Sequence, residues 1–179
     1  MNCFSAGIIN PKGKFVREGE RIHRDKYGMG SYVLAFQKDA GAEKDVEITE
    51  VDIDNFIRAK GAIFSAIRTM LNSLEFDVSM IEEVYVAGGN RKRHQYEECG
   101  QYWNVPGYSS GKFHYIGNSS LTGAYLMLLS TQAEKKTYEL ASNMTYMELS
   151  TVPTYMDEFV GACFIPHTDA SMFPNVHQR

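Results

Sequence analysis

Two short segments in which an apolar run ends in small residues are the part of this sequence that could do chemistry. Residues 84–89 read VYVAGG and residues 113–120 read FHYIGNSS. Each begins with the β-branched and aromatic side chains that favour a strand, and each then reaches glycine. Glycine has no Cβ and tolerates positive φ, so a ring or a phosphate of a ligand can lie against the main chain there. Two such junctions indicate a nucleotide cleft at strand ends, although glycine is also the ordinary residue after any strand.

The second junction also favours an anion. Gly117 is followed by small hydroxyl residues that open a helix, and the exposed N–H groups at a helix start favour negative charge. The alternative is that Ser119, Ser120 and Thr122 only cap these N–H groups.

The elements that must position these junctions alternate between strands and helices. Strands are expected at residues 31–36, 46–48, 84–89, 113–116 and 146–149. Helices are expected from residue 50 to 74 and at residues 121–129, 132–144 and 155–162. Strands mixed with helices of this length predict an α/β layer structure.

The helix that follows Thr49 is the clearest element. Thr49 is expected to be its N-cap, and Glu50 and Asp52 lie in its first turn, where carboxylates favour the positive end of the helix dipole. Apolar residues then recur with a period of 3.6 as far as Leu74, which indicates a face packed on the core. Lys60 falls on or beside this face. Its side chain is expected either to extend to water or to reach a bound anion.

Composition excludes several classes of protein. At 179 residues the chain is one domain or one large lobe of a larger protein, and its net charge of -4 argues against a general nucleic-acid binder. No apolar run is long enough for a membrane span, and no signal peptide is visible at the N-terminus. Cys3, Cys99 and Cys163 are scattered, which indicates reduced thiols in a cytoplasmic protein. Three thiolates are also too few for an iron–sulfur cluster held by this chain alone.

Common catalytic motifs are absent. Gly88 and Gly89 are not followed by the Gly-Lys-Ser/Thr of a phosphate-binding loop, and residues 117–121 lack the second glycine of a nucleophile elbow. The five histidines show no metal-ligand spacing, so no metal site is expected.

Four blocks of the sequence together resemble a known family. They are ITEVDIDNFIRAKGAIFSAI at residues 48–67, VYVAGG at 84–89, FHYIGNSSLTGA at 113–124 and MDEFVGACFIPHTD at 156–169. They resemble the C-terminal domain of the reductive activators of corrinoid proteins. These are ATP-dependent iron–sulfur proteins of the ASKHA superfamily, which also contains sugar kinases, heat-shock cognate chaperones and actin.

The resemblance implies a ribonuclease-H-like lobe with a mixed sheet flanked by helices, which would be the single lobe formed by residues 1–179. It implies that Gly88 and Gly89 line the adenosine side of a cleft for ATP or ADP with Mg²⁺, near Lys60, Gly117 and Asn118. In such activators ATP hydrolysis accompanies electron transfer from a [2Fe–2S] cluster to an inactive Co(II) corrinoid, which becomes the Co(I) form that accepts a methyl group. The implied partners are a corrinoid protein or corrinoid-dependent methyltransferase, the N-terminal part of the activator, and a second copy in a homodimer.

The sequence departs from the family in two ways. The chain is expected to lack the ferredoxin-like domain, the middle region and the first ASKHA lobe with its phosphate loop, so ATP hydrolysis by this chain alone is doubtful. Residues 90–111 also do not match, because the family continues AGG with Phe-Gly and a helix. Back-translation of this segment with a one-base shift can read TGKDINMKNAVNIGMFPDIPRE, which looks like the family segment. We therefore hypothesise two compensating frameshifts, and expect residues 90–111 to be a poorly ordered surface excursion that damages the adenosine side.

Three functions follow from these patterns. The chain is the nucleotide-binding lobe of a corrinoid activator, a binding module that holds a nucleotide or a corrinoid protein without turnover, or an inactive fragment of a truncated or frameshifted gene. Nucleotide binding separates the second from the third.

Overall fold

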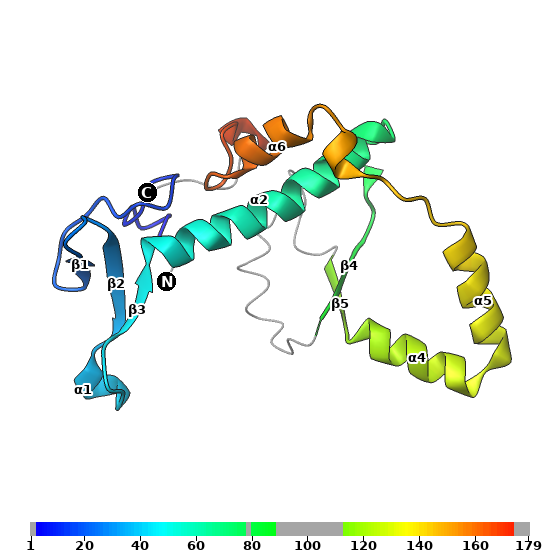
Figure 1. The fold of residues 1–179 in the computed structure, drawn as a ribbon, viewed down its shortest axis with the longest axis horizontal. Coiled ribbons are helices and arrows are strands. Elements are labelled where there is room, and N and C mark those ends of the chain that lie inside the picture. Colours follow the sequence, from blue (N-terminus) through cyan, green and yellow to red (C-terminus); the bar gives the residue numbers. More distant parts are fainter. Residues whose placement is uncertain (1–2, 78–79, 89–112, 174–179) are drawn as a thin grey trace.

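Helix α2 (Glu50–Ser73) is the axis of the structure (Figure 1). The computed structural model describes residues 3–77, 80–88 and 113–173. Thr49 caps α2 as expected. Its hydroxyl accepts a hydrogen bond from Asp52 N, while the Asp52 carboxylate accepts one from Thr49 N at 2.9 Å. This reciprocal pair satisfies backbone donors that the first helical turn leaves open.

A three-stranded antiparallel sheet lies at the N-terminal end of α2. Its order is β1 (Ile22–Arg24), β2 (Gly30–Ala35) and β3 (Val46–Thr49), with the short helix α1 (Gln37–Ala40) between β2 and β3. Strand β3 runs directly into α2, so the sheet and the helix are joined without a loop.

The main core lies between this sheet, α2 and the N-terminal segment. Its buried members are Phe4, Ile8, Ile9, Phe15, Ile53 and Ile57. The apolar stripe expected on α2 therefore packs into a core at its N-terminal half. Part of the stripe stays outside, because Phe56, Ile63 and Met70 are between 42 % and 45 % exposed.

A second cluster joins α2 to α6 (Tyr155–Ala162). Phe64 on α2 packs against Ala162 and Phe173, and all three are buried. The helices approach closely at Gly61, where a Cβ atom would lie 3.1 Å from Cys163 Sγ. A 3₁₀ turn (Ala170–Met172) closes this end of the described chain.

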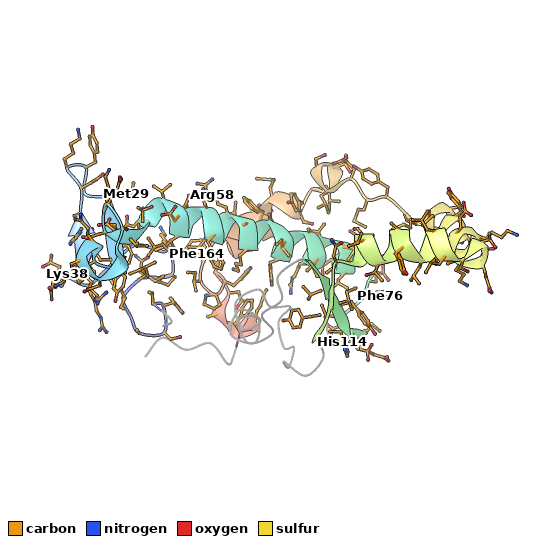
Figure 2. All side chains as sticks on the ribbon, turned by 90° about the horizontal axis from the view of Figure 1, so that it is seen from below. Met29, Lys38, Arg58, Phe76, His114 and Phe164 are labelled. Carbon is orange, nitrogen blue, oxygen red and sulfur yellow. The ribbon has the colours of Figure 1, made fainter. Side chains whose placement is uncertain are left out.

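The remaining elements lie towards the other end of α2, and α4 and α5 extend past it (Figure 1). Strand β4 (Val84–Ala87) pairs in parallel with β5 (Phe113–Gly117), which leads into α4 (Ser119–Leu129) and then α5 (Thr131–Ser142). Neither α4 nor α5 contains a buried residue. Figure 2 shows the same elongation, with Met29 and Lys38 at one end and Phe76 and His114 towards the other.

The fold confirms the α/β class, but some details differ from the expectation. Within the described residues the parallel and antiparallel pairings occur in two separate sheets. The strand expected at 146–149 is wrong, since a 3₁₀ turn (Leu149–Thr151) begins there. The cap of α4 is Asn118 rather than Ser119 or Ser120. In the described ranges, every helix falls short of the length and apolar character that crossing a membrane demands.

Candidate functional site

The carboxyl ends of β4 and β5 bring the two glycine junctions together. The register pairs Ala87 with Gly117, and the N–H of Gly88 donates to the carbonyl oxygen of Gly117 at 2.8 Å. Parallel pairing is the reason, because it places the carboxyl ends of both strands at one edge. In α/β folds this edge is where ligands bind.

Gly88 and Gly117 both adopt backbone conformations that favour glycine. Both also have open space at the position where a side chain would stand. The φ angle is +152° at Gly88 and +67° at Gly117, and a Cβ atom at either position would meet nothing within 4 Å. The bare main chain is therefore accessible to a flat or bulky ligand group.

Helix α4 starts at this same edge and offers backbone donors. Asn118 Oδ1 accepts a hydrogen bond from Leu121 N at 3.0 Å, so the cap uses one of the first N–H groups. Among the described residues, no acceptor is recorded for the N–H of Ser119 or Ser120. The expected alternative was capping by the serine and threonine hydroxyls. In the described residues Asn118 is the cap instead, and the Thr122 hydroxyl donates back to Asn118 O. The helix start keeps the donors and the dipole that attract an anion.

Two predicted site residues are not part of this described group. Gly89 lies outside the described residues. Lys60 lies between α2 and the segment after α6, where its ammonium donates to the carbonyl oxygens of Ala162, Phe164 and Pro166. It is only 3 % exposed, so the expectation that it extends to water is wrong. Its contact with a nucleotide stays a prediction.

The structure also brings together three possible metal ligands that are not apparent from their spacing in the sequence. Donor atoms of His23, Asp45 and Glu47 lie within 4.8 Å of one another, at the end of the molecule away from β4 and β5 (Figure 1). A hollow of about 530 Å³ adjoins it, lined by Asp45, Glu47 and neighbouring polar residues. His23 Nδ1 lies 3.2 Å from Glu47 Oε1, so a side-chain hydrogen bond across the sheet accounts for their approach. Strand pairing, which spacing does not reveal, brings these residues together.

Comparison with known proteins agrees with the resemblance found in the sequence. Residues 1–177 match the family described as the C-terminal domain of RACo, the ASKHA domain. The chain belongs to this family. The match includes both strand-end glycines and the start of α4, so the site described above lies inside an ASKHA domain.

Two relatives show how much of a larger protein such a domain represents. The solved structure of a reductive activator for corrinoid, iron-sulfur protein is 44 % identical with a TM-score of 0.86, over 98 % of this chain and 28 % of that one. The corrinoid activation enzyme RamQ of Eubacterium limosum is 24 % identical over 168 residues, which are 88 % of this chain and 28 % of RamQ. This ASKHA chain therefore spans less than a third of either relative.

Proposed function

We propose that this ASKHA chain is the C-terminal nucleotide-binding lobe of an ATP-dependent reductive activator of corrinoid proteins. Such an activator uses ATP hydrolysis to help reduce an inactive Co(II) corrinoid to the Co(I) form needed for methyl transfer. The observation that carries the proposal is the meeting of Gly88, Gly117 and the start of α4 at one strand edge. Both relatives are named as activators of corrinoid proteins or corrinoids, which supports it.

The residues at this edge fit a nucleotide with its Mg²⁺. Open main chain at Gly88 and Gly117 suits the adenosine, and the N–H groups at the start of α4 suit negative charge. Gly89 would extend the same surface, and Asn118 would hold the helix start in place. ATP would supply the driving force for a reduction that is otherwise uphill, through its different affinity for two states of the activator.

The other components of the activity would belong to other parts of the activator or to its partners. The electron would come from an iron–sulfur cluster outside this chain. A corrinoid protein or corrinoid-dependent methyltransferase would receive it. The N-terminal part of an activator would complete the ATP cleft, and a homodimer is the proposed assembly.

A second candidate is a fragment or binding module without turnover. The observation that favours it is the mismatch of residues 90–111 with the family, which lies outside the described residues. Reading the gene across codons 88–113 tests the frameshift hypothesis. A one-base shift that restores the family segment supports it, and a reading frame without such a shift contradicts it.

Calorimetric titration with MgATP and MgADP tests the proposed site. We expect heat of binding for the wild-type chain and affinity roughly tenfold weaker for Gly117→Ala, because a Cβ atom would strain the positive φ and fill the open main chain. Gly41→Ala is the matched control, since Gly41 has φ +62° and nothing within 4 Å of a Cβ atom but lies beside α1. The proposal is wrong if the wild-type chain gives no heat, or if both variants bind like the wild type.

A further inference from the structure

Lys60 is a buried cation on the main helix of the fold. It is 3 % exposed, although the solvated charge of a lysine ordinarily keeps its side chain at the surface. Burial lowers its pKa to about 8, so the ammonium remains protonated at neutral pH. A charge in this position needs compensation from the surrounding protein.

Three backbone carbonyl groups supply that compensation. Lys60 Nζ donates to Ala162 O at 2.7 Å, to Phe164 O at 2.8 Å and to Pro166 O at 2.5 Å. An ammonium group has three N–H donors, so all of them are used within the chain. Hydrogen bonds from a charged donor are about twice as strong as neutral ones.

The carbonyl groups form an arrangement that suits a cation. Ala162 is the last residue of α6, so its carbonyl belongs to the negative end of the helix dipole. The other two follow at alternate positions in the segment after α6. Among the ion pairs of the described residues none includes Lys60, so dipoles rather than a carboxylate balance its charge.

The surroundings exclude water and hold the lysine in place. The Phe64 ring centroid lies 5.8 Å from Lys60 Nζ and 5.2 Å from the ring of His167, which is 9 % exposed. Cys163 Sγ lies 3.1 Å from the position that a Cβ atom would take at Gly61, so the helix and the end of α6 approach closely there. In Figure 2 Phe164 lies on the opposite side of α2 from Arg58. The ammonium is therefore enclosed between α2 and the segment after α6.

We propose that Lys60 is a positioning residue whose ammonium group fills a cation site formed by the carbonyl oxygens of Ala162, Phe164 and Pro166. It thereby fixes the segment after α6 on α2. This joins two sequence blocks, residues 48–67 and 156–169, that are about a hundred positions apart. The role differs from the nucleotide contact expected of Lys60, since it leaves no ammonium donor for a ligand.

A chemical rescue experiment tests the cation site in the full chain. Lys60→Ala removes the side chain beyond Cβ, which propylammonium can replace. We expect the Tm of Lys60→Ala to fall by about 5–10 °C, because three buried acceptors lose their donor. Propylammonium chloride is expected to restore a large part of this loss, because it binds only the folded state. Tetramethylammonium chloride at equal ionic strength is expected to restore none, because it has no N–H.

Two variants control for salt and for packing. Lys136→Ala, at an exposed position on α5, should respond equally to both salts. Lys60→Met keeps an apolar stem without the charge. Its Tm should therefore be lower than that of the wild type, and propylammonium should not restore it. A Tm of Lys60→Met within about 1 °C of the wild type would overturn the proposal. An apolar side chain that fills the same space would then stabilise the fold as well as the ammonium group does. An equal response of Lys60→Ala to both salts would overturn it as well.

¹⁵N NMR of the wild-type chain tests the enclosed ammonium without any substitution, so it applies even if both Lys60 variants fail to fold. We expect one lysine ammonium signal with slow hydrogen exchange, unchanged when MgATP is added. Fast exchange of every lysine ammonium would contradict the enclosed site. A slowly exchanging signal that shifts with MgATP would indicate that Lys60 contacts the nucleotide, and this would overturn the proposal.

Discussion

Glu50 connects the N-terminal segment to the main helix through two hydrogen bonds. Its carboxylate accepts from Lys14 Nζ at 3.0 Å and from Phe15 N at 3.0 Å, and the residue is 5 % exposed. Burial alone would raise the pKa of Glu50. The hydrogen bonds from Lys14, Phe15 and Gly30, together with the charge of Lys14, outweigh it, so the pKa lies below its ordinary value of 4.5. The charged form is therefore favoured in the folded state.

This pKa direction predicts how acid affects stability. Because the folded pKa of Glu50 is lower than its unfolded value, its stabilisation is complete above pH 4.5 and is lost as pH falls through the folded pKa. We expect Glu50→Gln to unfold with a free energy about 1–2 kcal/mol lower at pH 7, and to lose less on acidification than the wild type. Urea unfolding at pH 7 and at acidic pH measures this, with the exposed Glu18→Gln as control. Equal acid sensitivity in Glu50→Gln and the wild type would contradict the assignment.

Single residues also show what sequence reasoning can reach. The helical period placed Lys60 correctly on or beside the apolar face of α2. Its acceptors come from residues 162–166, about a hundred positions away, and no local pattern encodes that contact. A strand that ends in glycine is a local signal, and it pointed to Gly88 and Gly117, whose contact with a nucleotide stays a prediction. Asn118 was added by the resemblance to the family.

Among the elements, the capped start of α2 followed most directly from sequence. The structure confirms Thr49 as the N-cap with Asp52 in the first turn. It adds that the two residues form a reciprocal capping box, which the sequence analysis did not predict. The strand expected at residues 146–149 failed for an equally local reason. The Glu148 carboxylate accepts from Ser150 N and Oγ, which favours a turn over a strand.

The cap of α2 gives a prediction about this element. We expect Thr49→Ala to lower the free energy of unfolding by about 1 kcal/mol, because the N–H of Asp52 loses its acceptor. Thr137→Ala on α5 is the control, because the Thr137 hydroxyl donates only to the carbonyl of Ala133 one turn earlier. Chemical denaturation monitored by circular dichroism measures both. Equal stability of Thr49→Ala and the wild type would show that the cap does not hold α2.

At the level of the whole molecule, the fold leaves the apolar helix α4 exposed in the described part of the chain. On α4 the exposed fractions of Leu121, Leu128 and Leu129 are 67 %, 86 % and 65 %. Large exposed apolar surfaces mark interaction sites. The chain also matches only 28 % of the activator structure, with a TM-score of 0.86. A sequence predicts that α4 is apolar, but no local pattern says what packs against it.

We therefore expect α4 to bind the N-terminal part of an activator. Leu128→Asp should weaken association of this chain with the separately expressed remainder of the 44 % identical activator by tenfold or more, by burying a charge in an apolar contact. Leu34→Asp is the control, because Leu34 is 55 % exposed at the other end of the molecule. Sedimentation or light scattering of the mixtures measures this. Equal loss in both variants would exclude a specific role for α4.

We expect the edge formed by β4, β5 and α4 to bind a nucleotide. Titration of the ¹⁵N-labelled chain with MgATP, followed by amide NMR, locates the bound ligand directly. The amide signals of Gly88, Gly117, Ser119 and Ser120 should shift and saturate, while that of Gly41 should stay in place. Saturating MgATP that leaves these signals unmoved, or moves only signals around α1, would contradict it.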